Sequence, residues 1–165
     1  MTEQKKTVTA AMLIIRNEIL SGRTKDKNLS FVAETLNEVG VRLMEARVIP
    51  DIEDEIVDAV NTLRAKYDYV FTSGGIGPTH DDITAECVSK AFGRRLTIHP
   101  EAFRRMDEHY KQMGREMNEA RLRMAKTPEG ATLIDNPIST APGFNVENVY
   151  VMAGVPSIMQ AMLQG

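Results

Sequence analysis

The segment Ser73-Gly74-Gly75-Ile76-Gly77-Pro78-Thr79 has residue types that can hold a phosphate group through backbone contacts. Glycine occupies positions 74, 75 and 77, which lets the backbone adopt positive φ angles and lets a ligand approach closely. A helical pattern follows from about residues 81–82, and the free N–H groups at its start would point back at this segment. We therefore predict an anion-binding turn made by Ser73, Gly74, Gly75, Gly77, Pro78 and Thr79.

Two well-known phosphate-binding patterns do not describe this turn. No Gly-Lys-Ser/Thr ends it, as in a Walker A loop, and Gly77 is followed by Pro78, Thr79 and His80 rather than by the dinucleotide fingerprint. The glycines alone fit a tight strand-to-helix turn equally well. The polar residues that come next favour a binding site.

Two carboxylates, Asp81 and Asp82, lie in the polar run 79–84. They would repel a phosphate unless a cation lay between them, and Mg²⁺ or another divalent cation bridging both kinds of oxygen resolves this conflict. We therefore predict Asp81 and Asp82 as metal ligands, and as catalytic residues if a reaction occurs. A helix N-cap role for one of them is an alternative, and the two roles are compatible.

Polar residues after other predicted strands would reach the same edge of the sheet. Asp51 follows the second strand and is a further catalytic candidate, although a helix N-cap is the simpler explanation of its local sequence. The stretch after the first strand supplies weaker ligand-binding candidates, for which an ordinary polar loop is the alternative: Glu18, Ser21, Gly22 and Asn28.

The elements that must position these residues alternate in type. Strands are predicted at 7–15, 41–49 and 69–72, and helices at about 28–39, 51–63 and 82–91. Short strands are expected at 132–134, 143–146 and 149–152, and a last helix at 157–163. This order predicts an α/β fold with a mostly parallel sheet and helices on both faces. We expect one domain over 7–165, after a polar tail at 1–6.

A helical hairpin is expected at about 100–126, with a break at Gly114 and an inner face of Met106, Met113, Met117 and Met124. It carries more basic than acidic side chains. A solvated surface is the favoured interpretation, and a basic surface that collects an anionic ligand is the alternative.

Composition and sequence patterns argue against a nucleic-acid-binding protein and against a membrane protein. A net charge of −3, the absence of Trp and the lack of a basic stripe with interleaved aromatics argue against a nucleic-acid partner. The apolar run 10–15 is too short to cross a membrane, and no secretory pattern is present. The single cysteine, Cys87, fits a core position and a cytoplasmic setting.

Taken in order, four motifs resemble the competence/damage-inducible protein A family, specifically its molybdopterin-binding-like domain. They are the runs at 18–28 and 73–84, Asn136-Pro137 with Ala141-Pro142-Gly143, and Gly154-Val155-Pro156-Ser157. The resemblance covers about residue 7 to the end of the sequence. It implies a three-layer α/β/α sandwich shared with molybdenum-cofactor biosynthesis proteins.

The resemblance also implies a ligand and its residues. Members of this fold family bind molybdopterin or its adenylated form, some transfer AMP from Mg-ATP, and trimers are common among them. Nearer relatives are linked to metal-dependent hydrolysis of ADP-ribose-type pyrophosphates. Thr84, Gly154 and Pro156 join the predicted ligand-binding residues on this basis, and Asp51 matches an acidic position near the ligand.

Two departures from the family pattern bear on function. Arg16 stands where the family usually has glycine, and it would either fill the pocket or pair with a phosphate. Fuller members continue past this sequence, some with an amidohydrolase domain, so that activity is not expected here. Three functions follow: binding of a phosphorylated pterin or nucleotide, metal-dependent pyrophosphate hydrolysis, or a non-catalytic assembly module. A homo-oligomer, with a trimer favoured, is expected.

Overall fold

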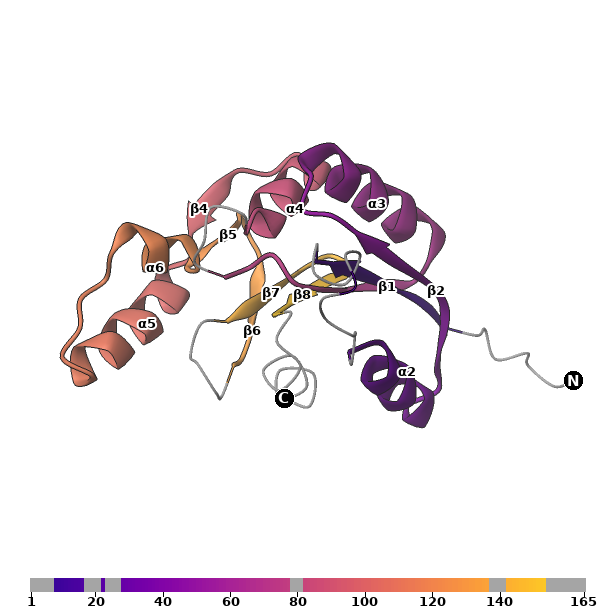
Figure 1. Cartoon of the computed structure of the whole chain (residues 1–165), viewed down its shortest axis with the longest axis horizontal. Coiled ribbons are helices and arrows are strands. Elements are labelled where there is room, and N and C mark those ends of the chain that lie inside the picture. The colour runs from indigo at the N-terminus through magenta and orange to yellow at the C-terminus, as the bar shows by residue number, and fades with distance from the viewer. Residues whose placement is uncertain (1–7, 17–21, 23–27, 78–81, 137–141, 154–165) are drawn as a thin grey trace, which may run out of the picture.

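A six-stranded sheet in the order β2-β1-β3-β8-β7-β6 forms the centre of the molecule (Figure 1). The computed structural model describes residues 8–16, 22, 28–77, 82–136 and 142–153. The strands of this sheet are β1 (Val8–Ile15), β2 (Val41–Ile49), β3 (Tyr69–Ser73), β6 (Thr132–Ile134), β7 (Gly143–Val146) and β8 (Val149–Met152). β2, β1, β3 and β8 are parallel, whereas β7 and β6 continue the sheet as antiparallel strands. The predicted mostly parallel sheet is confirmed.

The central strand β1 is apolar because both of its faces are covered. All its residues from Ala10 to Ile15 are buried. Successive side chains of a strand point to opposite faces. The odd-numbered ones from Ala11 to Ile15 therefore belong to one core cluster, and the even-numbered ones from Ala10 to Ile14 belong to the other. A strand covered on both faces needs apolar residues at every position, as its sequence predicts.

Helices cover the two faces of the sheet and complete three layers (Figure 1). α2 (Asn28–Glu38) packs Val32 and Leu36 against one face. α3 (Glu53–Lys66) and α4 (Thr84–Phe92) pack against the other face, with Ile56, Val60 and Val88 in that core. The α/β/α sandwich expected from the sequence is confirmed.

The carboxyl ends of the four parallel strands lie level with one another. Ile15 pairs with Ile49 across β1 and β2, and Ser73 pairs with Ile14 and Met152 on its two sides. Whatever follows these strands therefore meets at one edge of the sheet, where open α/β folds bind ligands.

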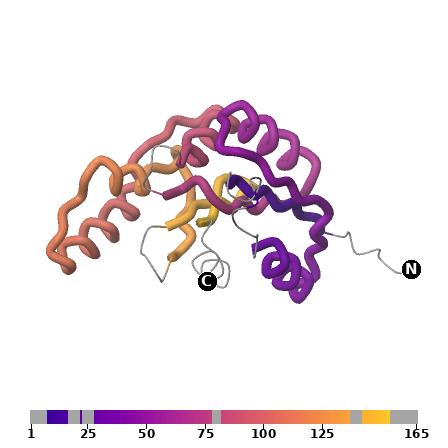
Figure 2. Tube along the Cα trace, in the orientation of Figure 1, coloured from indigo at the N-terminus to yellow at the C-terminus, as the bar shows by residue number. Residues whose placement is uncertain are grey.

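Residues 96–128 form a smaller unit, here called the helical unit, which extends from one end of the molecule (Figure 2). Its base is an antiparallel pair, β4 (Leu96–Ile98) and β5 (Lys126–Pro128). α5 (Pro100–Gln112) and α6 (Glu119–Arg123) lie between these strands in sequence. The helix break at Gly114 is confirmed by its φ of +71°. The β4–β5 pair was not predicted, and the second helix is shorter than the hairpin pattern suggests.

The inner face of the helical unit contains three of the four predicted methionines. Met106 is buried with Ala102 and Ala125, and Met117 and Met124 pack against this cluster. Met113 was wrongly placed in this face: it is 51% exposed. It is the residue at the C-terminal cap of α5, immediately before the turn at Gly114, where the helical repeat no longer sets its direction.

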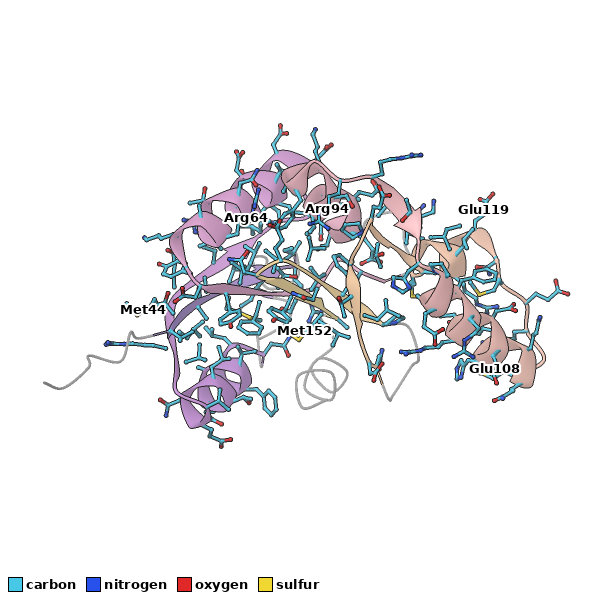
Figure 3. All side chains as sticks on the ribbon, turned by 180° about the vertical axis from the view of Figure 1, so that it is seen from behind. Met44, Arg64, Arg94, Glu108, Glu119 and Met152 are labelled. Atoms are coloured by element: carbon cyan, nitrogen blue, oxygen red, sulfur yellow. The ribbon has the colours of Figure 1, made fainter. Side chains whose placement is uncertain are left out.

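Most charged side chains of α5 are paired, and the helical unit to which α5 belongs lies far from the edge-strand residue Met44 (Figure 3). Arg104 bridges Glu101 and Glu108, Arg105 bridges Glu101 and Asp135, and Lys111 pairs with Asp107. Arg121 stacks on the ring of Tyr110, 4.4 Å from its centroid. A continuous basic face on α5 is therefore not what the structure shows, because carboxylates alternate with the basic groups.

Cys87 lies in the core, as predicted. Its side chain is 1% exposed on the buried face of α4. No helix among the described residues is long and apolar enough to cross a membrane. The helix predicted at 157–163 lies outside the described residues.

Candidate functional site

Hydrogen bonds connect the glycine turn to β8 and to the start of α4. The N–H of Gly74 donates to the carbonyl oxygen of Met152 at 3.1 Å, which continues the β3–β8 pairing by one residue. The N–H of Thr84 donates to the carbonyl oxygen of Gly75 at 3.0 Å, and the Thr84 hydroxyl donates to that of Gly74, also at 3.0 Å. The first residue of α4 therefore holds the turn in place, and Thr84 itself is fully buried.

Gly74 and Gly75 are required by packing as well as by conformation. Both have positive φ angles, +100° and +74°. A Cβ atom at position 74 would collide with the backbone oxygen of Ile15, and one at position 75 would collide with the hydroxyl of Thr84. The close neighbours of these two glycines are parts of the protein, so the turn itself requires residues without a side chain at both positions.

Gly77 lies against the carboxylate of Asp82. A Cβ atom at position 77 would lie 2.8 Å from an Asp82 oxygen. The residue at the N-cap of α4 is Ile83, which makes no side-chain capping bond. The N-cap role considered for Asp82 is therefore wrong, because the helix begins only at Thr84. Asp82 lies instead in the segment between the turn and the helix.

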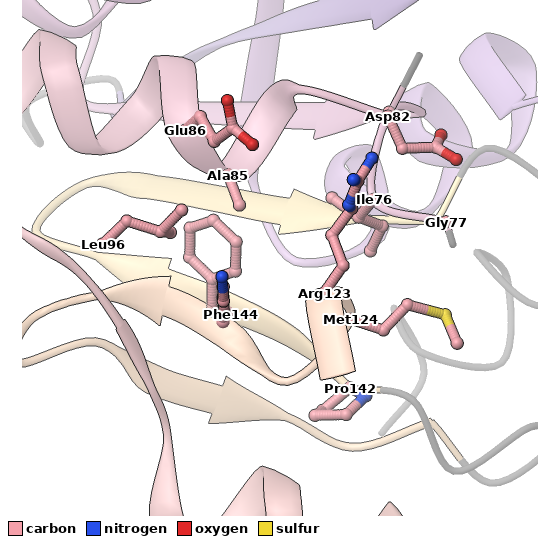
Figure 4. Close-up of a pocket in the computed structure, with 12 residues that line it drawn as sticks. Ile76, Gly77, Asp82, Ala85, Glu86, Leu96, Arg123, Met124, Pro142 and Phe144 are labelled. Carbon is pink, nitrogen blue, oxygen red and sulfur yellow. The ribbon is translucent and has the colours of Figure 1, made fainter. Parts of the chain in front are cut away.

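A pocket lies between the glycine turn, the start of α4 and the helical unit (Figure 4). It holds about 370 Å³ of space, part of it open to solvent. Its polar lining comes from Gly75, Gly77, Asp82, Glu86, Arg123 and Lys126, and its apolar lining from Ile76, Ala85, Leu96, Met124, Pro142 and Phe144. The sequence predicted the turn and Asp82 as parts of one site, and the structure brings both to this pocket.

The basic residues of this pocket were not predicted as site residues. Arg123 ends α6 and Lys126 begins β5, so the helical unit supplies both. Figure 4 shows the side chain of Arg123 extending from α6 toward the glycine turn. The excess of basic residues over 100–126 is the signal that could have found them, since an anion-collecting surface was one interpretation of it.

Two hydroxyl groups at the end of β3 are buried without hydrogen-bond partners in the described part of the chain. They are the side chains of Thr72 and Ser73, both 0% exposed. Adjacent strand residues face opposite sides of the sheet, so one hydroxyl lies on each face. Buried polar groups of this kind are uncommon, because desolvation without a partner is costly.

The other predicted residues are spread along the same edge. Arg16 follows β1, where its N–H donates to the carbonyl oxygen of Ile49 at 3.1 Å. Its Cγ lies 3.1 Å from where a Cβ of Gly74 would be, so its stem runs beside the turn. Asp51 precedes Ile52, the N-cap residue of α3, which excludes the capping role considered for Asp51.

Asn28 and Gly22 differ in burial. Asn28 is buried at the first residue of α2, whereas Gly22 is exposed with a φ of +79°. None of Asp51, Arg16, Asn28 and Gly22 lines the described pocket. The remaining predicted site residues lie outside the described residues: Glu18, Ser21, Pro78, Thr79, Asp81, Gly154 and Pro156.

A metal centre is not assembled by the described residues alone. Among them, no group of three or more His, Cys, Asp or Glu side chains converges as metal ligands do. Asp82 is the predicted ligand that the structure describes, and its carboxylate oxygens suit a hard divalent cation. Glu86 is the other carboxylate in the described pocket lining.

The fold and this edge of the sheet define a class of protein. Residues 11–165 match the family described as "Probable molybdopterin binding domain", and the chain belongs to that family. A solved structure of the protein CinA from Thermoplasma acidophilum, of unknown function, is 35% identical with a TM-score of 0.87. The alignment covers 94% of each chain. The resemblance to the competence/damage-inducible protein A family is thereby confirmed.

The curated relatives that the chain matches are longer proteins, and the chain spans only part of their length. A protein from Pyrobaculum calidifontis is 38% identical over 95% of this chain and 62% of its own length. A "CinA-like protein" from Desulfosudis oleivorans is 36% identical over 94% of this chain and 38% of its own length. The tungsten cofactor synthesizing protein MoaB from Pyrococcus furiosus has a TM-score of 0.60 at 19% identity, covering 98% and 91% of the two chains, and this likeness concerns the fold.

Proposed function

We propose that this chain binds a phosphorylated pterin or nucleotide of the molybdopterin type at the carboxyl edge of its sheet. The pocket beside the glycine turn is the observation that carries the proposal, because it joins backbone, carboxylate and basic groups around one space. Family membership supplies the ligand class. The phosphate lies near Gly75–Gly77. The apolar residues of the pocket lining, among them Ile76 and Phe144, receive the ring of the ligand.

A divalent cation, Mg²⁺ in the first place, is part of the proposal. Asp82 would hold it, together with Asp81, and the cation would neutralise the repulsion between these carboxylates and the phosphate. The Asp82 carboxylate lies over Gly77, so a cation bound to it would be next to the turn. Asp51 follows β2, which β1 separates from β3 in the sheet, and it remains a candidate for contact with a larger ligand.

Calorimetric titration of ATP, ADP-ribose and a phosphorylated pterin, with Mg²⁺ and with EDTA, tests this function. We expect binding that Mg²⁺ strengthens, and we expect Asp82→Asn to remove that gain. Asp58→Asn is the matched control, because Asp58 is exposed on α3 and does not line the pocket. If the unsubstituted chain binds no nucleotide and no pterin under either condition, the proposed function is wrong.

Hydrolysis of ADP-ribose-type pyrophosphates is the second candidate, which the basic and acidic groups facing one pocket favour. Water would add to one phosphorus atom and the bridging P–O bond would break, giving AMP and ribose 5-phosphate. The metal on Asp82 would lower the pKa of that water. Release of AMP from the same incubations, absent in Asp82→Asn, would establish this activity, whereas binding without release would leave the chain as a binding domain.

A homo-oligomeric assembly and a cytoplasmic location are also part of the proposal. A homo-oligomer, with a trimer favoured, fits the exposure of Phe103 and Met113 on the helical unit, 37% and 51%. A cytoplasmic location is consistent with Cys87, which is buried and not in a disulfide. Light scattering after gel filtration measures the mass in solution, and a monomer at all concentrations would contradict the oligomer.

A further inference from the structure

Two basic side chains from the helical unit line the same pocket as two carboxylates. Arg123 and Lys126 lie in the same pocket lining as Asp82 and Glu86. The two pairs come from parts of the chain about 40 residues apart. Arg123 and Lys126 are both half-buried, and Figure 4 shows the side chain of Arg123 extending toward the glycine turn.

We propose that Arg123 and Lys126 form an anion position of their own, which binds a phosphate or pyrophosphate group without a divalent cation. The inference deepens the proposed function, on which it rests for the ligand class, by naming the residues that hold the negative end of the ligand. It also changes how charge is balanced at the turn. The side chains of Arg123 and Lys126 supply positive charge there, in addition to any metal ion on Asp82.

The charge distribution of the pocket decides where an anion goes. Asp82 and Glu86 repel it, and Arg123 and Lys126 attract it. The lining between the two pairs is apolar, with Ile76 and Phe144 among its residues. Apolar surroundings lower the local dielectric, so both the attraction and the repulsion exceed those between fully exposed charges.

The two basic residues suit a phosphate in different ways. An Arg guanidinium can donate two parallel hydrogen bonds to phosphate oxygens, and a Lys ammonium adds a compact positive charge. Other basic groups of the helical unit are not equivalent, because Arg104, Arg105 and Lys111 do not line this pocket.

Titration with inorganic pyrophosphate in EDTA and a low-chloride buffer tests the inference. We expect the unsubstituted chain to bind pyrophosphate, and we expect Arg123→Gln and Lys126→Gln each to weaken this binding about tenfold, the loss typical of a charge-assisted hydrogen bond. Asp82→Asn should strengthen it, because one repelling carboxylate is removed.

Matched controls are available in the same unit. Arg115→Gln and Lys111→Gln make the same changes of charge at exposed positions outside the pocket, and they should leave the affinity within about twofold. Thermal unfolding of each variant shows that it is folded. The inference is overturned if the unsubstituted chain does not bind pyrophosphate in EDTA, or if the control substitutions weaken binding as much as those at Arg123 and Lys126.

The two proposals fail in different ways. If pyrophosphate binding depends on Arg123 and Lys126 but neither ATP, ADP-ribose nor a pterin binds, the anion position exists and the proposed function is wrong. If nucleotides bind with Mg²⁺ and the substitutions at Arg123 and Lys126 have no effect, the proposed function stands and this inference is wrong. Asp82→Asn separates the cases further. It should reduce the gain in nucleotide affinity from Mg²⁺, and it should raise the affinity for pyrophosphate in EDTA.

Discussion

The hydroxyl of Thr84 donates a 3.0 Å hydrogen bond to the carbonyl oxygen of Gly74. This bond joins the first residue of α4 to the first residue after β3, across the whole glycine turn. The turn is therefore held from inside the protein by a side chain that is itself buried. Its shape does not depend on a ligand, so the surface that it offers to the pocket is formed in advance.

Replacing Gly75 with alanine should destabilise the protein by more than a left-handed backbone alone explains. Gly75 and Gly114 have similar φ angles, +74° and +71°, but a Cβ atom would meet Thr84 at position 75 and nothing within 4 Å at position 114. We expect Gly114→Ala to cost about 1 kcal/mol and Gly75→Ala about 2–4 kcal/mol in urea unfolding. Equal costs would mean that the contact with Thr84 relaxes freely.

The hydroxyl of Thr84 should contribute measurably to stability. Thr84→Val keeps the shape of the side chain but leaves the carbonyl oxygen of Gly74 without this donor, which costs about 1–2 kcal/mol. Ser89→Ala on the same helix is the contrast, because its buried hydroxyl has no partner among the described residues. We expect that variant to be neutral or more stable. A Thr84→Val variant as stable as the parent in urea would contradict this account of the turn.

Arg16 should add to anion binding rather than block it. Its stem runs beside Gly74, yet Arg16 does not line the described pocket, so its bulk lies outside that pocket. We expect Arg16→Gly and Arg16→Gln to weaken ATP binding by about two- to fivefold, as loss of a nearby charge does. Calorimetry at two salt concentrations measures this effect. Affinity that appears only in Arg16→Gly would show instead that Arg16 fills the site.

Stability should fall at alkaline pH through Cys87. Burial, with Glu53 and Glu86 nearby, raises the pKa of this thiol to about 12. The unfolded chain loses the thiol proton from about pH 8.5, whereas the folded chain keeps it, so ionisation favours unfolding as the pH rises from about 9 to 12. The slope is at most about 1.4 kcal/mol per pH unit.

Comparison with Cys87→Ala isolates this contribution from that of the other groups that titrate in the same range. The variant should lose less unfolding free energy than the parent between about pH 9 and the upper limit of the measurement. Parallel curves for the two proteins would show that the folded thiol ionises as easily as the unfolded one.

Local patterns in the sequence were enough for the main sheet and its helices. β1 is apolar at every position because it is covered on both faces, and that pattern is visible without any structure. The turn at Gly74–Gly77 and Asp82 were also identifiable as neighbours, since only a few residues separate them. These features depend on contacts that are close in the chain or repeat along it.

Other features were missed because their causes are not local. The three-residue strands β4 and β5 are too short to show a pattern, and each forms only because the other is opposite to it. Met113 belongs to the methionine pattern but lies at the end of α5, where the chain turns away. The start of α4 at Thr84 depends on the bonds that Thr84 makes with the turn, so an acidic residue upstream was wrongly expected to cap it.

The sequence by itself therefore determined the α/β/α fold, the family and the glycine turn with Asp82, because short-range order and periodic burial encode them. Only the tertiary structure decided that Arg123 and Lys126 line one pocket with that turn. Their position follows from the β4–β5 pair at the base of the helical unit, which returns the chain to the pocket after α6. The sequence around the glycine turn does not predict basic residues from a distant segment. Their position depends on tertiary packing and not on a periodic pattern in the sequence.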